Sequence, residues 1–296
     1  MGGAREPLQK AARASGGDGV DIDVLGTLAV RENGVSITPT APKPRQVLAL
    51  LALNADQVVP VGTLTEELWG STPPRSARPT LQTYILQLRE LITTALQQDT
   101  GESGGRSAKD VLLTVPGGYL LKSGEGVSDV REFDRLAGAG YRAMDADDPP
   151  RAARLLREAL ALWSGPALTD VHTGPHLVTQ AKRLEESRLC ALDQRIEADL
   201  RLGRHRELLA EMTVLVSRYP THESLYGQYM LALYRSGRRG EALDAYQRLR
   251  ATLVRTLGLE PSAALSKLQR SILMSGPDPV PARHAAVPPA AVGSGA

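Results

Sequence analysis

The sequence has almost no cysteine and no long apolar run, and each shortage excludes a class of protein. One cysteine among 296 residues, Cys190, cannot form an internal disulfide, which argues against a disulfide-stabilised secreted domain. Cys190 falls in an apolar-periodic segment, so we expect it in the core. No run of about 18 apolar residues predicts a membrane span, and residues 1–20 lack the hydrophobic stretch of a signal peptide. We therefore expect a cytoplasmic protein.

The sequence also lacks the excess of positive charge that would by itself indicate a nucleic-acid partner. The net charge is +2, and residues 21–125 carry nine lysines and arginines against eleven aspartates and glutamates. Residues 126–275 carry 22 basic residues against 19 acidic ones. A DNA-binding hypothesis must therefore rest on where the charges lie and not on their totals.

No catalytic or metal-binding motif stands out. His172 and His176 have the four-residue spacing of two metal ligands on one helix face. Gly174 and Pro175 lie between them and no third ligand is near, so we expect loop histidines. The phosphate-binding pattern G-x-x-x-x-G-K-[ST] is absent, which argues against an ATPase. We therefore expect no enzymatic activity, no metal and no cofactor.

Apolar periodicity predicts a mixed first half. Residues 20–37 alternate as a small β unit around the turn Asn33-Gly34. Prolines at 39, 42 and 44 are expected to break the chain before a helix from Arg45 to about Asn54. A second helix is predicted from Val61 to Trp69, ended by the following glycine.

A third helix is predicted over residues 75–92, RSARPTLQTYILQLRELI, and continues to about Gln97. The Gly- and Ser-rich segment 98–110 is expected to be a mobile loop. The stretch VLLTVPGGYLLK that follows predicts a hairpin of strand, Pro-Gly-Gly turn and strand.

The third helix has two contrasting faces. At about 100° per residue, one face is apolar and consists of Leu81, Tyr84, Ile85, Leu88 and Ile92. The opposite face is mainly amide and hydroxyl, and consists of Thr80, Gln82, Thr83, Leu86, Gln87 and Glu90. Glutamine suits the N6/N7 edge of adenine, and threonine offers thymine a hydroxyl and a methyl group. The face is either a base-reading surface or simply a solvated one.

Residues 129–275 predict helices only. The turn Leu202-Gly203-Arg204 recurs as Ser236-Gly237-Arg238, 34 residues later, which is the period of tetratricopeptide helix pairs. A weaker copy lies at 147–160. Residues 1–19 and the Pro/Ala-rich residues 276–296 are expected to be disordered tails.

Several stretches together resemble one family. LQTYILQLREL and TVPGGYLL, after an N-terminal β unit, look like an OmpR/PhoB-type winged helix. The remainder resembles the bacterial transcriptional activation domain in VREFDRLAGAGYRAM, ALALWSGPALTDV, RLEESRLCALDQRIEADLRLGRH, YRSGRRGEALDAYQRLRATLVRTLGLEPS and LQRSIL. That pair of domains, in that order and over about residues 20–275, is similar to the Streptomyces antibiotic regulatory protein family.

The resemblance implies an α+β winged-helix domain over 20–123 and an all-α, tetratricopeptide-like helical repeat domain over 127–275. It implies a transcriptional activator of a secondary-metabolite (antibiotic) gene cluster, which binds direct repeats in double-stranded promoter DNA as a side-by-side homodimer or oligomer. It also implies recruitment of RNA polymerase holoenzyme, including the sigma factor, by a cytoplasmic, nucleoid-associated protein.

The expected DNA contacts fall into three groups. Base contacts are assigned to the exposed face of the third helix: Thr80, Gln82, Thr83 and Gln87. Backbone contacts are assigned to Lys43, Arg45, Arg75, Arg78 and, more weakly, Arg89. The wing comprises Arg106, Lys109, Gly117, Gly118 and Tyr119, and Tyr119 either packs under the hairpin or bonds a phosphate.

Two departures from the family pattern keep an alternative open. The family often has a basic residue at the position of Gln87 and an arginine at the position of Val115. With the acidic balance of residues 21–125, these changes favour a protein-interaction adaptor whose winged domain does not bind DNA.

Overall fold

The computed structural model describes residues 19–98 and 106–274. The predicted tails, Gly19 excepted, and most of the predicted loop at 98–110 lie outside these residues. The described chain forms two compact units. The first contains residues up to Gly140 together with Leu155–Ala191, and the second contains Tyr141–Arg154 together with the residues from Leu192 onward. The predicted domain boundary near residues 123–127 lies inside the first unit and stays a prediction.

The first unit begins with a three-stranded antiparallel sheet, which confirms the predicted β unit. Strands β1 (Val20–Asp23), β2 (Ala29–Glu32) and β3 (Val35–Ser36) pair in the order β1-β2-β3. The β2–β3 turn is Asn33-Gly34, and both residues have positive φ, as a tight primed hairpin turn requires.

Three helices follow, close to their predicted positions: α1 (Pro42–Leu53), α2 (Val61–Trp69) and α3 (Ala77–Gln98). The expectation that all three prolines precede the first helix was wrong. Pro42 opens α1 and Pro44 lies in its first turn, where a missing N–H costs nothing because that group has no partner inside the helix. Gly70, with a φ of 63°, ends α2 as predicted.

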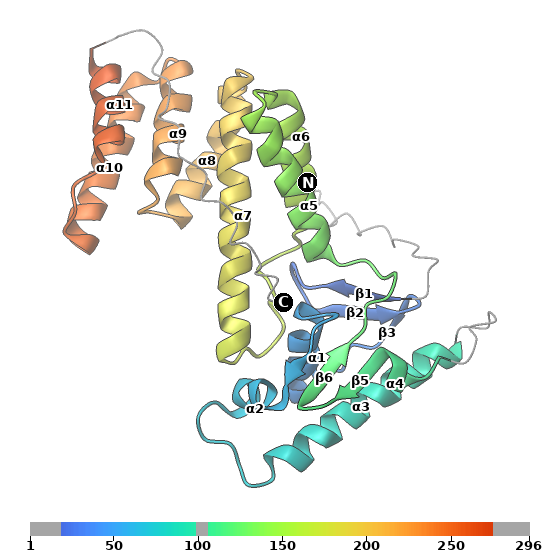
Figure 1. The fold of residues 1–296 in the computed structure, drawn as a ribbon. Helices are drawn as coiled ribbons and strands as arrows, with labels where there is room; N and C mark the ends of the chain where they lie inside the picture. Colours follow the sequence, from blue (N-terminus) through green and yellow to red (C-terminus); the bar gives the residue numbers. More distant parts are fainter. Residues whose placement is uncertain (1–18, 99–105, 275–296) are drawn as a thin grey trace, which may run out of the picture. The chain divides into compact units, whose positions relative to one another are not determined.

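The predicted hairpin is present and belongs to a second sheet. Strands β5 (Leu112–Val115) and β6 (Gly118–Leu121) pair, and β6 also pairs with β4 (Val59–Pro60), which was not predicted. Residues 106–110 are not all loop, because Ser107 and Asp110 form a capping box that starts the short helix α4 (Ala108–Val111). Figure 1 shows α3, α4 and the hairpin side by side.

Later segments of the chain complete the first unit. Asp129, the first residue of α5 (Asp129–Asp145), accepts hydrogen bonds of 2.8 Å from the backbone N–H groups of Val24 and Leu25. Phe133 of α5 packs edge-on against Trp163, with ring centroids 5.6 Å apart. The hydrogen bonds of Asp129 therefore join the segment after β1 to the start of the helical segment.

A buried carboxylate provides a further link in the first unit. Glu67 of α2 is 2% exposed and accepts hydrogen bonds from the backbone N–H groups of His176 (2.9 Å) and Leu177 (3.0 Å) at the start of α7 (Pro175–Arg201). A Cβ on Gly174 would lie 2.1 Å from the Glu67 carbonyl oxygen, so only glycine fits beside it. His176 is helical, contrary to the prediction of a loop residue.

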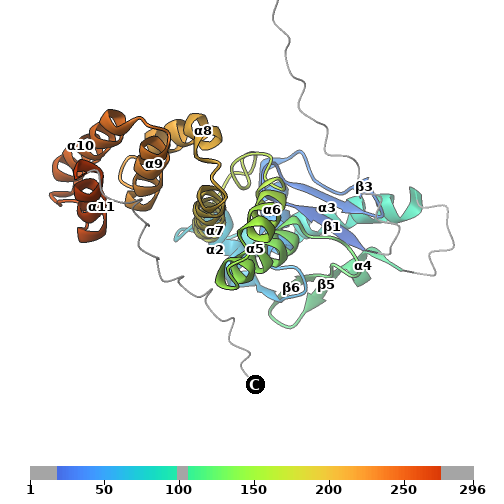
Figure 2. The same ribbon diagram turned by 90° about the horizontal axis from the view of Figure 1, so that it is seen from above.

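The second unit is helical throughout its described part. It contains the last turns of α5 and α7, the start of α6 (Pro149–Leu160), and α8 (His205–Arg218), α9 (Glu223–Arg235), α10 (Arg239–Leu257) and α11 (Ala263–Leu273). Neighbouring helices from α8 to α11 lie side by side (Figure 2).

The predicted repeat appears as a recurring turn between helices. Gly203 and Gly237 have φ values of 76° and 79°, and Asp147 takes the same place in the weaker copy with a φ of 54°. In each turn the following residue donates its N–H to the carbonyl five residues back, at 2.9–3.0 Å. Asp147 adopts this left-handed conformation because a short polar side chain tolerates it better than most.

The expectation of a buried cysteine was wrong. Cys190 is exposed on α7, while its neighbours Leu189 and Ala191 are buried. No helix in the described residues is long and apolar enough to span a bilayer, and within the same residues no cluster of His, Cys, Asp and Glu has the makings of a metal site.

Candidate nucleic-acid interface

The two faces of α3 are disposed as the sequence predicts. Leu81, Ile85, Leu88 and Ile92 are buried against the other elements of the first unit, and Tyr84 is half-buried. On the opposite side the amide and hydroxyl residues Gln82, Thr83 and Gln87 are exposed, and Thr80 is half-buried. The buried stripe fixes the rotation of α3, so the polar face is presented in one orientation.

Arg89 attaches the hairpin to α3. Its guanidinium donates to the Leu112 carbonyl through Nε (3.1 Å) and Nη2 (2.8 Å), and Nη2 also donates to the Thr114 hydroxyl at 2.8 Å. Arg89 thus positions the wing relative to the helix. A phosphate contact would compete with these bonds, and that part of the prediction stays untested.

The wing presents a turn and buries its aromatic residue. Gly117 is exposed, with a φ of 81° that favours glycine. Gly118 is buried in β6, where a Cβ would lie 2.4 Å from the Val59 carbonyl oxygen. Tyr119 is 7% exposed, so of the two roles left open by the sequence the structure shows packing.

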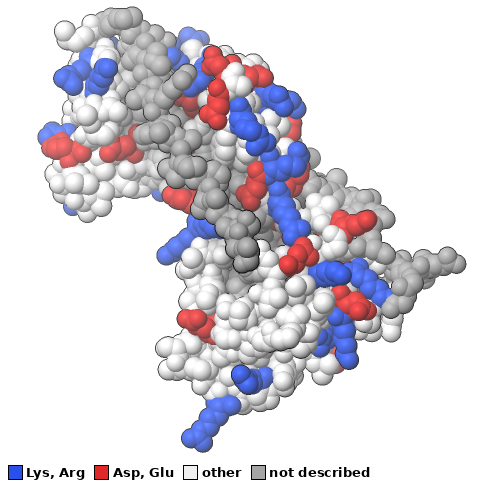
Figure 3. All heavy atoms as spheres, in the orientation of Figure 1, with Lys and Arg blue, Asp and Glu red and all other residues white. Residues whose placement is uncertain are grey.

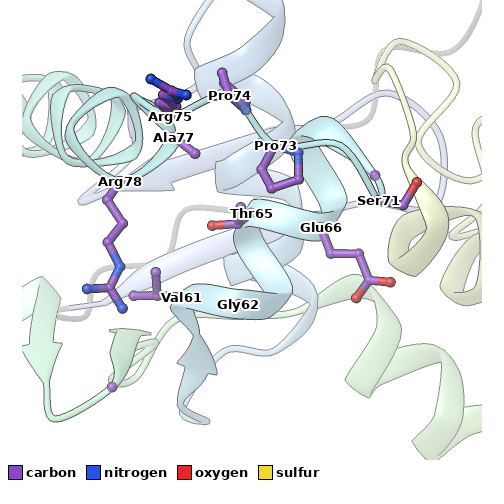
Figure 4. Close-up of a pocket in the computed structure, with 12 residues that line it drawn as sticks. Val61, Gly62, Thr65, Glu66, Ser71, Pro73, Pro74, Arg75, Ala77 and Arg78 are labelled. Atoms are coloured by element: carbon purple, nitrogen blue, oxygen red, sulfur yellow. The ribbon is translucent and has the colours of Figure 1, made fainter.

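A shallow hollow of about 650 Å³ joins the wing turn to the start of α3. Its lining includes Val61 and Thr65 of α2, Pro74, Arg75, Arg78 and Gly117. In Figure 4 the Arg78 side chain extends from α3 toward Val61 at the start of α2. The hollow brings together three residues that were predicted separately, namely Arg75, Arg78 and Gly117, and α2 was not expected to contribute.

Besides Arg89, three of the predicted cations have partners inside the first unit. Arg45 donates to the carbonyls of Leu28 and Pro39 and pairs with Asp170. Lys43 Nζ donates to the Leu68 carbonyl at 2.6 Å. Arg106 pairs at 2.8 Å with the buried carboxylate of Glu32. These cations offset internal acceptors, so they contribute less positive potential to a ligand than free cations would.

The remaining cations are exposed. The side chains of Arg75 and Arg78 have no hydrogen bond or ion pair with any described residue, and Lys109 is exposed at the base of the wing. Asp110 follows Lys109 in the chain. Hydrogen bonds from the Ser107 side chain and backbone hold the pKa of Asp110 below its ordinary value, which favours the negatively charged carboxylate beside the Lys109 cation. On the face shown in Figure 3, the region of α2 and the start of α3 carries few charged groups of either sign.

The arrangement of α3, the hairpin and the helix pairs is typical of one class of protein. A helix with an exposed amide and hydroxyl face, held beside a hairpin and followed by stacked helix pairs, is the architecture of a winged-helix regulator. Residues 36–101 match the family model described as "Transcriptional regulatory protein, C terminal", and residues 128–273 match the "Bacterial transcriptional activator domain".

Several individual regulatory proteins are similar to this chain over most of its length. The chain is 52% identical to Regulatory protein DnrI of Streptomyces peucetius, covering 87% of this chain and 93% of DnrI. It is 34% identical to Transcriptional regulator RedD of Streptomyces coelicolor, covering 71% of RedD, and 36% identical to Regulatory protein AfsR, of which it spans only 27%. The chain belongs to the Streptomyces antibiotic regulatory protein family, and the relatives that it matches are transcriptional regulators.

A solved structure supports the fold. Mycobacterium tuberculosis EmbR, in complex with a low affinity phosphopeptide, matches with a TM-score of 0.78 and 32% identity. The match covers 87% of this chain and 66% of that one. The α+β winged helix followed by a helical domain is therefore shared with that protein.

Proposed function

We propose that this regulator activates transcription by reading promoter DNA with α3. Gln82, Thr83, Gln87 and Thr80 face base edges in the major groove. Arg75 and Arg78, with no internal partner among the described residues, hold the phosphate backbone. The turn at Gly117 approaches the backbone beside the adjacent minor groove. The carrying observation is the exposed, largely uncharged polar face on a helix whose other side is fixed in a core.

Membership of the family suggests the DNA target and the protein partners of the proposed activator. The target is the promoter of a secondary-metabolite gene cluster, bound at direct repeats by copies of the chain lying side by side. The helical domain recruits RNA polymerase holoenzyme, including its sigma factor, because stacked helix pairs commonly present a peptide-binding surface. The protein works in the cytoplasm at the nucleoid, without a cofactor.

Footprinting at low salt on the DNA upstream of the gene and its neighbours tests the proposal. We expect protection of repeated half-sites, and we expect Gln82→Ala to weaken cognate binding by about 1–3 kcal/mol and to relax one base position. Gln97→Ala is the matched control, because Gln97 is exposed in the last turn of the same helix. Equal binding by both variants would remove α3 from the interface.

A second candidate function rests on the distribution of cations. Lys43, Arg45, Arg89 and Arg106 all donate to internal acceptors, which leaves few groups for phosphates. This favours an adaptor that contacts other proteins and not DNA. The two candidates differ in one result: an adaptor gives no salt-dependent footprint on any sequence.

A further inference from the structure

Leu86 is an apolar residue on the polar face of α3. Of the large hydrophobic side chains on this helix, Leu86 alone is exposed, at 57%, whereas Leu81, Ile85 and Leu88 are almost completely buried. A single exposed leucine is ordinary on a protein surface. Leu86, however, lies on the face of α3 that is proposed to contact DNA.

Helical spacing places Leu86 directly beside two proposed base-reading residues. It follows Gln82 by four residues and Thr83 by three, and side chains at these separations are neighbours on a helix surface. Arg78 lies eight residues earlier, about 12 Å away along the helix axis. In the proposed complex Leu86 therefore faces the same partner as Gln82 and Thr83, about two turns beyond the phosphate contact of Arg78.

We propose that Leu86 reads the 5-methyl group of a thymine in the major groove. The inference rests on the proposed function and specifies one base in its target. The thymine methyl is the apolar group that the four base pairs display on the major-groove floor. Leucine has no hydrogen-bond donor, so it cannot hold a phosphate or pair with a base edge. Contact with the methyl group removes apolar surface on both partners from water.

A protein partner fits this surface less well. On the described surface of α3 the exposed neighbours of Leu86 are Gln82, Thr83, Gln87 and Glu90, so the helix itself offers no continuous apolar patch around it. The core of a protein interface is usually such a patch, rich in aromatic and aliphatic groups. An isolated methyl-sized contact among hydrogen-bonding groups matches a thymine in its base pair.

The test removes the methyl group from the DNA and its partner from the protein. A duplex is first selected from a random pool by the full chain, and each thymine in it is then replaced singly by deoxyuridine. For the unchanged protein we expect one position to lose about four- to fifteenfold in affinity, the loss expected for one or two buried hydrocarbon groups. Leu86→Ala should bind the original duplex with a similar loss and show no further loss with uracil at that position.

Two control variants make the result specific to Leu86. Leu86→Met keeps an apolar contact and should retain sensitivity to uracil, and Gln82→Ala should be weaker throughout but equally sensitive at that position. If every uracil substitution affects Leu86→Ala as it affects the unchanged protein, the inference is wrong while the proposed function stands. If the unchanged protein selects no duplex, both are wrong. Circular dichroism confirms that the exposed substitutions leave the helix content unchanged.

Discussion

The outward face of α3 and the contact between α2 and α7 both consist of polar side chains. Those on α3 are exposed, whereas those between α2 and α7 are buried and hydrogen-bonded. On α3, Gln82 and Gln87 are exposed, and the arginines at its start have no partner within the described residues. At the start of α7, Glu67 is buried and accepts hydrogen bonds from three backbone N–H groups and from Gln46.

The difference separates residues that hold the fold from residues available to a ligand. A buried polar group is tolerated only when it is hydrogen-bonded, so a polar group that is buried and bonded is already committed to the fold. An exposed polar group fixed on a rigid helix remains available. By this criterion Arg45 and Glu67 stabilise the first unit, whereas Arg78 and Gln82 remain available to a ligand.

The largest effect is expected from Glu67→Ala. Its removal leaves buried N–H groups at the start of α7 without acceptors and also removes a negative charge from the positive end of that helix. We expect a loss of roughly 3 kcal/mol, or a Tm lower by about 6–12 °C, measured by thermal unfolding of the full chain.

The adjacent residue provides the control for that prediction. Glu66 has a side chain 58% exposed and pairs with His176 at 3.0 Å on the surface. Glu66→Ala should change stability by less than about 0.5 kcal/mol. Similar Tm values for the two variants would mean that burial does not distinguish these carboxylates, and the comparison would lose its basis.

Smaller effects are expected from substitution of two arginines, Arg78 and Arg45. One substitution should change DNA affinity and the other should change stability. Arg78→Ala should weaken binding to all duplexes alike and lower the slope of log affinity against log salt by about one, with little change in Tm. Arg45→Ala should do the reverse and lower stability by about 1–3 kcal/mol, because the carbonyls of Leu28 and Pro39 lose a donor.

Salt titrations of DNA affinity, run beside thermal unfolding, separate the two arginines. A reduced salt slope for Arg45→Ala at full stability would assign that guanidinium to the phosphate backbone despite its internal bonds. The same experiment bears on the adaptor alternative, for which neither substitution changes a salt slope.

Much of the fold could be predicted because it depends on local patterns. Each of these patterns can be recognised in a short stretch of neighbouring residues. Examples are the alternation of residues 20–37, the apolar stripe of α3 and the glycine turns at 203 and 237. Strand β4 has only two residues, which is too short to show alternation, and α4 depends on one capping pair. Such short elements owe their existence to their neighbours and not to their own sequence.

The candidate site could be predicted only in part, for the same reason. The exposed face of α3 follows from periodicity, but the partners of the cations do not. Arg45 pairs with Asp170, which is 125 residues away, and Arg106 pairs with Glu32, which is 74 residues away. Glu67 gave one local signal, a carboxylate beside Leu64 and Leu68 on the buried stripe of α2.

The smallest expected effect concerns Asp56, a carboxylate in the first unit that is exposed like the polar face of α3 but hydrogen-bonded like Glu67. Asp56 accepts hydrogen bonds from the Ser123 N–H (2.8 Å) and hydroxyl (2.5 Å) and from Arg131 (2.7 Å). Burial raises its pKa, but the bonds from Ser123 and Arg131 outweigh burial and hold the pKa below its ordinary value of 3.8. These contacts connect the turn after α1 to the end of β6 and to α5.

The sign of the pH dependence follows from that lowered pKa. Folded Asp56 binds a proton less readily than the unfolded chain does, so its contribution to stability is complete well above pH 3.8 and is lost as the pH falls through the folded value. Asp56→Asn keeps a residue that tolerates the positive φ of 66° but removes the charge. We expect this variant to melt below the unchanged protein at pH 7 and the difference to shrink as the pH falls below about 4. A Tm difference that stays constant from neutral to acidic pH would mean that the ionised form of Asp56 contributes nothing, and that exposure of the side chain outweighs its hydrogen bonds.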